Sequence, residues 1–186
     1  MEYCCSIHIR ATTFYVFSTE NWKRPQKEVN SIMKLLDKYL DDCLDELHKE
    51  DIRFIFLGDR SIFPESMRQQ MKNIEDETKN NLHIVNLALN YGGRDEIVHA
   101  ANQLLHSGKE RITEEDMASA MYTSESPELD LIVRTGGDLR ISNFLLWQAA
   151  YAELYFVDTL WPDMKPADVD AAIANFNQRK RRFGGV

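Results

Sequence analysis

The sequence has no uninterrupted apolar run of about 18 residues, the length that a membrane-spanning helix needs. Its first ten residues, MEYCCSIHIR, lack the apolar core of a secretory signal peptide. Cysteine is scarce. The chain has only Cys4, Cys5 and Cys43, and the first two are adjacent. Three cysteines cannot all pair within one chain, and this spacing fits neither a disulfide framework nor a zinc site. These absences favour a reducing cytoplasmic location.

An excess of basic residues is also missing. The chain has 22 Lys and Arg against 30 Asp and Glu, a net charge of -8, so nucleic-acid binding is not expected. No repeat, linker or low-complexity segment interrupts the 186 residues. The chain is long enough for one sizeable core, its hydrophobic content of 44% argues against disorder, and a single domain over residues 1–186 is expected.

The sequence does show an alternation of short apolar runs with longer amphipathic segments. Strands are predicted at residues 11–17, 52–57, 82–89, 129–133 and 153–157. Helices are predicted at residues 26–49, 64–80, 94–107, 113–121, 142–151 and 166–178. Strands that alternate with helices predict an α/β fold with a largely parallel central sheet flanked by helices.

Polar residues gather directly after the predicted strands. They follow the first strand at 18–24, the third at 90–94 and the fourth at 134–142. Ligands of parallel α/β sheets bind beyond the carboxyl ends of the strands. These three segments are therefore the candidate binding residues.

The residue types in these segments indicate a phosphate or diphosphate ligand. Arg24, Arg134 and Arg140 carry guanidinium forks that match pairs of phosphate oxygens. Ser142 would begin a helix whose free N–H groups face an anion. Glu153 lies in an otherwise apolar segment, where a carboxylate is unfavourable unless it is paired or binds a metal. A divalent ion beside the phosphate is therefore expected.

Each residue taken alone also has a purely structural interpretation. Ser18 and Asn21 could cap the following helix, and Trp22 could be a core residue. The arginines could pair with some of the many acids, and Glu153 could pair with a lysine or arginine. A phosphate-binding α/β module of some other kind would also explain the arginines and glycines. Only the gathering of these groups at strand ends favours a binding site.

Three stretches of the chain resemble the cis-prenyltransferase family, specifically bacterial undecaprenyl diphosphate synthases (isoprenyl transferases). They are FYVFSTENWKRP, LNYGGRDEI and DLIVRTGGDLRISNFLLWQAAYAELYFVDTLWPD, and the third is long and specific. The resemblance implies an enzyme that adds isopentenyl diphosphate units to an allylic diphosphate, usually farnesyl diphosphate. Mg²⁺ would assist departure of the allylic diphosphate. The implied product is a long cis-polyprenyl diphosphate that carries cell-wall (peptidoglycan) precursors.

The resemblance also implies roles for individual residues. Asn21 matches the catalytic residue proposed to help remove the proton that sets the new double bond, and Glu153 matches a Mg²⁺ ligand. The implied substrate-binding residues are Ser18, Thr19, Glu20, Trp22, Arg24, Arg134, Arg140, Ile141, Ser142 and Gly184. Gly184 belongs to a tail motif that, in the family, reaches the diphosphate site across a homodimer interface. Helix 26–49 and the sheet would line a tunnel for the growing chain, and contact with a membrane would be peripheral.

The sequence departs from the family at its start. It lacks the first strand with its Met-Asp-Gly-Asn-Gly-Arg-Trp-like motif, which supplies a metal-binding aspartate and the loop that cradles the allylic diphosphate. We therefore expect an N-terminally truncated isoprenyl transferase domain with weaker allylic diphosphate and Mg²⁺ binding. Asp138 stands where the family usually has Glu, and the segment 106–128 is slightly short. A non-catalytic partner subunit of a cis-prenyltransferase remains the alternative.

Overall fold

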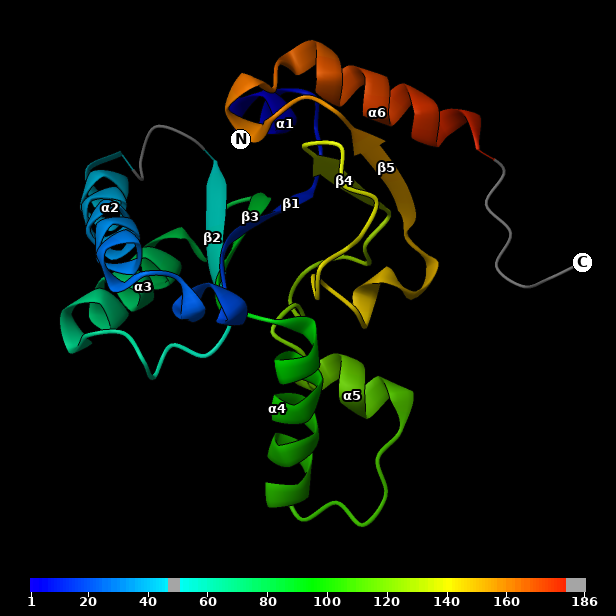
Figure 1. The fold of residues 1–186 in the computed structure, drawn as a ribbon. Helices are drawn as coiled ribbons and strands as arrows, with labels where there is room; N and C mark the ends of the chain where they lie inside the picture. Colours follow the sequence, from blue (N-terminus) through cyan, green and yellow to red (C-terminus); the bar gives the residue numbers. More distant parts are fainter. Residues whose placement is uncertain (47–50, 180–186) are drawn as a thin grey trace, which may run out of the picture. The chain divides into compact units, whose positions relative to one another are not determined.

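A computed structural model describes residues 1–46 and 51–179 of the chain (Figure 1). The chain divides into two compact units, Met1–Pro127 and Glu128–Val186. The expectation of one domain for the whole chain stays a prediction.

The first unit is built on a three-stranded parallel sheet with the order β1-β3-β2. Its strands are β1 (Ala11–Ser18), β2 (Ile52–Leu57) and β3 (His83–Tyr91). Its helices are α1 (Glu2–Ser6), the 3-10 turn η1 (Thr19–Lys23), α2 (Gln26–Glu46), α3 (Glu65–Thr78), α4 (Gly93–His106) and α5 (Glu114–Ala120). The central position of β3 brings its carboxyl end between those of β1 and β2.

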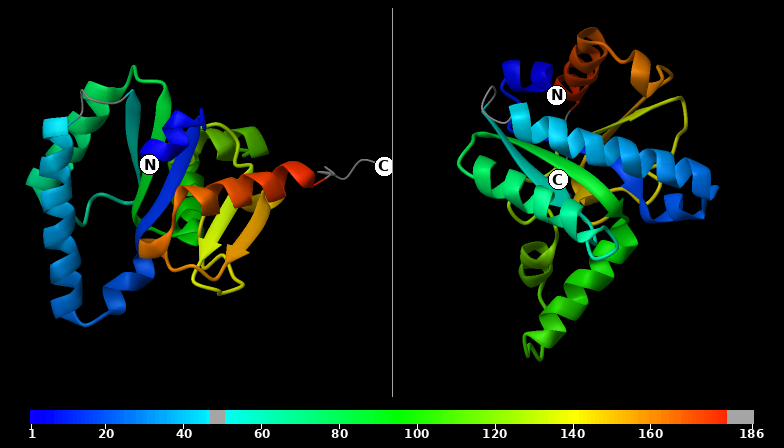
Figure 2. Two further views of the ribbon diagram at one scale, coloured as in Figure 1. Left: turned by 90° about the horizontal axis from the view of Figure 1, so that it is seen from above. Right: turned by 90° about the vertical axis from the view of Figure 1, so that its left-hand side faces the viewer.

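The core of the first unit lies where α2 and α3 cover one face of this sheet. Figure 2 shows the two helices side by side along the strands. The buried residues of α3 are Met67, Met71, Ile74 and Thr78, and this spacing gives the helix one apolar stripe. Met71 and Ile74 are fully buried, so truncating either to Ala would cost about 2–5 kcal/mol of stability.

The second unit contains a two-stranded parallel sheet of β4 (Leu131–Thr135) and β5 (Glu153–Val157). The other elements are η2 (Gln148–Tyr151), η3 (Trp161–Asp163) and α6 (Pro166–Gln178). Proline begins α6, where its missing N–H is not needed. The backbone N–H of Lys165 donates to Asp168 Oδ2 over 2.8 Å and caps the same end.

The predicted α/β fold with parallel strands flanked by helices is confirmed. The strands at 52–57 and 153–157 and the helix at 166–178 have the predicted bounds. Helix 26–49 is confirmed as far as Glu46, and residues 47–49 lie outside the described part of the chain. In the described residues, no helix is both long and apolar enough to cross a membrane.

The predicted helix at 142–151 is wrong. Three residues of this segment, Ser142, Asn143 and Leu145, have φ values of 49°, 62° and 45°. A right-handed helix cannot contain such residues, so only the short turn η2 forms, at the end of the segment. Ser142 therefore does not sit at a helix N-terminus, and the anion site expected from helix N–H groups is absent from this described segment. The sequence pattern also does not predict α1 or η1.

Candidate active site

The turn after β1 carries the residues predicted for a substrate site in the first unit. Ser18 ends β1, and its backbone N–H donates to Asn21 Oδ1 over 2.9 Å. Thr19 Oγ1 donates to Glu20 Oε2 over 3.3 Å. Because the backbone uses Oδ1 of Asn21, a ligand anion would be bound through the Nδ2 donors of this carboxamide.

Trp22 lies on the same turn and is half-buried against the core. Its ring meets that of Phe17 edge-on, with ring centroids 5.1 Å apart and an interplanar angle of 77°. Its indole Nε1–H donates to Asn90 Oδ1 over 2.8 Å. The indole is therefore fixed both by an apolar contact and by a hydrogen bond to the end of β3.

Arg24 follows the turn and is exposed. Its Nη1 donates to Glu28 Oε1 over 2.7 Å, and both side chains are about half exposed, at 47% and 48%. An exposed pair of this kind contributes about 0–1 kcal/mol. A phosphate group could replace Glu28 as the partner of Arg24 at little energetic cost.

The ends of β2 and β3 approach each other closely beside this turn. Asn90 is only 6% exposed, and its Nδ2 donates to the Asp59 carbonyl oxygen over 2.9 Å. Gly58 has a φ of 119°, and a Cβ atom there would lie 2.1 Å from the Leu89 carbonyl oxygen. Only glycine permits this approach. The sequence pattern indicates Asn90 as part of a candidate segment but does not predict its role.

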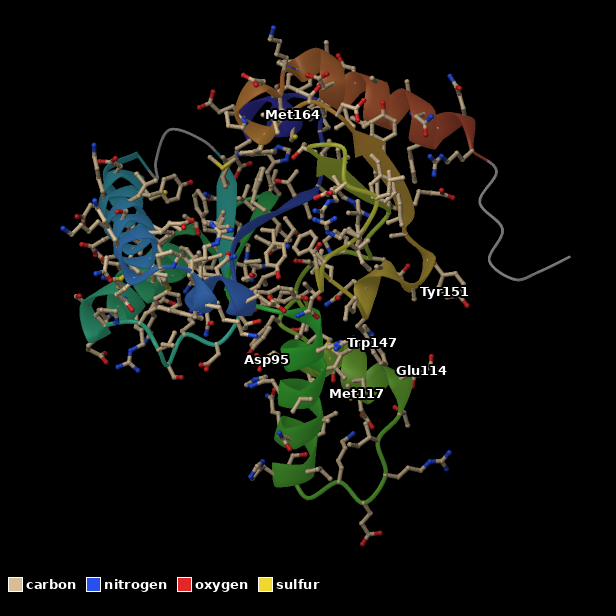
Figure 3. The ribbon with its side chains drawn as sticks, viewed as in Figure 1. Asp95, Glu114, Met117, Trp147, Tyr151 and Met164 are labelled. Atoms are coloured by element: carbon tan, nitrogen blue, oxygen red, sulfur yellow. The ribbon has the colours of Figure 1, made fainter. Side chains whose placement is uncertain are left out.

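A buried carboxylate that the sequence analysis missed lies on the first turn of α4. Glu96 is fully buried; it accepts a hydrogen bond from the Tyr91 hydroxyl over 2.5 Å and one from the backbone N–H of Tyr122 over 2.9 Å. Figure 3 shows its neighbour Asp95 at the start of the same helix. Burial, and then the charge of Asp95, raise the pKa of the Tyr122 phenol. Glu96 therefore ties α4 to the segment that follows α5, which is a structural task.

Four side chains of the second unit form a cluster at the end of β4 and in the loop that follows it. Arg134 Nη1 donates to Ser142 Oγ over 2.7 Å, and Arg134 Nη2 donates to Asp138 Oδ2 over 2.9 Å. Arg140 donates to the same carboxylate with both terminal nitrogens, over 2.8 and 2.6 Å. The structure thus brings together three predicted residues: Arg134 and Arg140 on Asp138, the position that departs from the family pattern, and Ser142 on Arg134. We call these four residues the arginine cluster.

Two glycines shape the loop that carries the arginine cluster. Gly136 and Gly137 have φ values of 85° and 76°, which favour glycine. Their N–H groups donate to the carbonyl oxygens of Thr159 and Val157 over 3.0 and 3.1 Å. These N–H groups therefore hold the loop to the end of β5 and the residues that follow it, and are not directed to a ligand.

The arginine cluster keeps an excess of positive charge. Two guanidinium groups face one carboxylate in these hydrogen bonds, so one unit of charge is uncompensated within the cluster. Arg134 Nε is buried and has no hydrogen-bond partner among the described residues. A buried donor without a partner is unfavourable, and an anion that reaches it would satisfy it. Ile141 is half-buried beside the cluster in the sequence.

Glu153, the predicted Mg²⁺ ligand, is paired with an arginine in this structure. Arg179 Nη1 donates to Glu153 Oε2 over 2.5 Å, and Arg179 Nε donates to Asn175 Oδ1 over 2.9 Å. Within residues 1–46 and 51–179, no three His, Cys, Asp or Glu side chains are grouped so that they could hold a metal ion. Gly184 lies outside the described residues.

Comparison with known proteins decides the family. A family described as "Putative undecaprenyl diphosphate synthase" matches residues 1–184. The chain is 49% identical over 187 residues to an isoprenyl transferase of Fusobacterium nucleatum, which covers 100% of this chain and 81% of that protein. The chain belongs to the undecaprenyl diphosphate synthase family.

Solved structures of the family have the same fold. The structure of "a probable undecaprenyl diphosphate synthase" from Campylobacter jejuni has a TM-score of 0.89 and 38% identity, and covers 100% of this chain and 88% of its own. That of lavandulyl diphosphate synthase from Lavandula x intermedia, in complex with dimethylallyl diphosphate, has a TM-score of 0.91 and 31% identity, with coverages of 99% and 83%. The predicted membership of the cis-prenyltransferases is confirmed, and the protein is a transferase enzyme.

Proposed function

We propose that this prenyltransferase condenses isopentenyl diphosphate with an allylic diphosphate, such as farnesyl diphosphate. The product would be a long polyprenyl diphosphate with cis double bonds that serves as a lipid carrier for cell-wall precursors. The observation that carries this proposal is the arginine cluster. It offers diphosphate-matching donors on a loop at the carboxyl end of a parallel strand, where α/β proteins bind their ligands.

We assign the diphosphate of isopentenyl diphosphate to the arginine cluster. Asp138 accepts hydrogen bonds from both arginines, as an anionic ligand would, which supports this assignment. A diphosphate carries more negative charge than one carboxylate and has more acceptor oxygens. It would therefore compete with Asp138 for Arg140, and it could also accept from Ser142 and from Arg134 Nε.

The turn after β1 is proposed to bind the allylic substrate. Arg24 would offset diphosphate charge, and Trp22 would lie beside the apolar chain. The Asn21 carboxamide can donate to the diphosphate as it stands, because its Oδ1 accepts from the Ser18 N–H. Its assistance in proton removal would require that this bond opens, which frees Oδ1 as an acceptor. Ser18, Thr19 and Glu20 would support the same turn.

Mg²⁺ is also part of the proposal, as an ion that arrives with the substrate phosphates. Mg²⁺ is commonly bound through one or two carboxylates plus phosphates and waters. Glu153 could supply one carboxylate if Arg179 releases it. When bound, the ion would offset the charge that develops on the departing diphosphate. We further propose a homodimer, a cytoplasmic location and peripheral contact with a membrane, since the product is a long apolar chain.

The test is isopentenyl incorporation by this 186-residue chain. Purified protein would receive farnesyl diphosphate, radiolabelled isopentenyl diphosphate and Mg²⁺, and the products would be separated by chain length. We expect products longer than farnesyl diphosphate, and their loss in Arg134→Gln but not in Arg68→Gln, whose arginine forms an exposed ion pair with Glu65. A folded chain that makes no longer product, with or without added Mg²⁺, would refute the proposal.

A further inference from the structure

One carboxamide connects all three strand ends of the first unit. Asn90 lies near the end of the central strand β3 and is almost fully buried. Its Oδ1 accepts from the indole Nε1–H of Trp22, on the turn after β1, over 2.8 Å. Its Nδ2 donates to the carbonyl oxygen of Asp59, in the loop after β2, over 2.9 Å. A single side chain therefore ties the turn after β1 and the loop after β2 to β3.

The chemistry of the two partners requires a carboxamide here. An indole N–H can only donate, and a backbone carbonyl can only accept. The bridging side chain must therefore present an acceptor to Trp22 and a donor to Asp59 at the same time. Among short side chains, an amide offers both on rigid neighbouring atoms. The two partners also fix which way the amide of Asn90 is turned.

The backbone at this position restricts the choice further. Asn90 has a φ of 47°, a left-handed conformation in which asparagine is favoured over most other residues. Glutamine would be one methylene too long and would be strained in this conformation. The same residue thus satisfies a sharp change of chain direction and a two-sided hydrogen bond.

We infer that Asn90 is the residue that positions Trp22, and with it the turn Thr19–Lys23, for the transfer reaction. The inference rests on the proposed function, in which this turn binds the allylic substrate. Without Asn90, the indole keeps its edge-on contact with Phe17 but can rotate about its side-chain bonds. Asn21 precedes Trp22 on the same turn, and its carboxamide keeps the hydrogen bond from the Ser18 N–H, so the loss of Asn90 would act on the reaction through the indole. Asn90 acts through Trp22 and does not itself touch substrate.

The position offers variants that separate this role from simple stability. Asn90→Gly removes both hydrogen bonds yet suits the left-handed backbone. Asn90→Asp keeps the acceptor for Trp22 and loses the donor to Asp59. The matched control is Asn86→Ser, because Asn86 is a second buried asparagine of β3 that binds Thr13 and Ser126. It precedes Asn90 on the same strand, and its hydrogen bonds go to residues other than Trp22.

The first readout is the Trp22 indole N–H resonance in ¹⁵N-labelled full-length protein, assigned by its loss in Trp22→Phe. We expect Asn90→Gly to shift this resonance, and Asn86→Ser to leave it in place even where both lower the unfolding temperature. Asn90→Asp should keep it near its wild-type position. An unchanged resonance in Asn90→Gly would overturn the inference, whether or not the protein turns over substrate.

The second readout is a kinetic cycle with Trp22→Phe. Asn90→Gly should lower kcat for isopentenyl incorporation by about tenfold, the change that loss of one well-placed hydrogen bond can produce. Asn86→Ser should change kcat by less than about twofold, because its partners lie away from the turn. The double variant Asn90→Gly, Trp22→Phe should be no slower than the slower single variant, because each substitution removes the same hydrogen bond between Trp22 and Asn90. Multiplied losses would show that Asn90 acts independently of Trp22. An inactive wild-type chain would refute the proposed function and leave the resonance as the test.

Discussion

The two groups of polar residues at strand ends in this protein are held by different kinds of bond. In the first unit, neutral groups fix one another: the Ser18 N–H, the carboxamides of Asn21 and Asn90, and the Trp22 indole. In the second unit, Arg134 and Arg140 share the Asp138 carboxylate. The neutral bonds are partly buried and should depend little on ionic strength. The charged bonds are more exposed, so salt or an anionic ligand can replace them.

This difference indicates two ways of preparing a binding site. The first unit is preorganised, because its donors and acceptors already satisfy each other and hold an apolar surface in place. The arginine cluster is instead held by an internal carboxylate that a diphosphate must replace. Binding there should gain less free energy than the bare count of donors implies, because the Asp138 bonds are lost. Each side of this comparison can be tested by substitution.

The largest effect is expected at Gly58, which allows the ends of β2 and β3 to meet. Gly58→Ala would place a Cβ atom 2.1 Å from the Leu89 carbonyl oxygen, so the backbone must move. We expect a loss of about 4 kcal/mol or more in the free energy of unfolding, measured by urea denaturation.

Gly108→Ala is the control for that experiment. Gly108 also has a positive φ, of 81°, but nothing lies within 4 Å of the place that a Cβ atom would take there. It should lose only the strain of the conformation, about 1 kcal/mol. Equal losses at the two positions would show that backbone strain alone, and not the close approach, makes Gly58 necessary.

The second effect concerns the charged side of the comparison. Arg134→Gln removes the guanidinium that bonds Ser142 and Asp138. We expect about a 100-fold loss of affinity for isopentenyl diphosphate, since hydrogen bonds to charged groups contribute about 1.5–3 kcal/mol each. Isothermal titration calorimetry would measure it. Arg134→Lys should recover little, because an ammonium group cannot reproduce the planar fork. Affinity equal to wild type would remove Arg134 from the site.

A smaller effect, of opposite sign, is expected at Asp138. Asp138→Asn removes the internal anion, so inorganic pyrophosphate should bind about threefold to tenfold more tightly at low salt. The advantage should shrink at about 0.5 M NaCl, where the variant and wild type approach each other. Weaker binding by the variant would show that Asp138 chiefly orients Arg140 and does not compete with the ligand.

The last prediction concerns how the stability of the first unit depends on pH. Burial raises the pKa of the Tyr15 phenol to about 12, with the Glu20 charge as a second cause. The folded protein therefore holds this proton more tightly than the unfolded chain, whose tyrosine titrates near a pKa of about 10. The contribution of Tyr15 to stability is present below about pH 10 and is lost as the pH rises towards about 12. Between about pH 9 and 11.5, the unfolding temperature should fall less steeply with pH for Tyr15→Phe than for the wild type. Equal slopes of unfolding temperature against pH in the variant and the wild type would contradict this role of Tyr15.

The sequence predicted the strands well because these strands are buried runs of β-branched and aromatic residues. The segment IRFIFL forms β2 with the predicted bounds, since its side chains are almost all buried. The helix at 142–151 could not be excluded from the sequence. Its residues suit a helix, but Ser142, Asn143 and Leu145 have positive φ values, and Ser142 is bonded to Arg134, a contact that residue type alone does not predict.

The candidate site could be predicted as a set of residues but not as a set of contacts. Trp22 and Asn90 are 68 positions apart, and nothing local in the sequence predicts the bond between them. The ion pair between Glu153 and Arg179 matches the structural interpretation that the sequence left open. The same is true of Arg134 and Arg140, which do pair with an acid. Charge and residue type predicted a diphosphate site. They did not predict which side chains pair with Arg134, Arg140 and Glu153, which only the structure shows.

The order β1-β3-β2 has a consequence for folding during synthesis on the ribosome. Neither β1 nor β2 has its partner strand until β3 has been synthesised. Ala11 pairs with Ile84, which is added 73 residues later. At about 5–20 residues per second, that interval lasts roughly 4–15 s. During it, the nascent chain carries two apolar strands that cannot yet form their sheet. We therefore expect chaperone demand during translation to be greatest just before β3 emerges, and a pause placed after β3 to aid folding more than one placed before it.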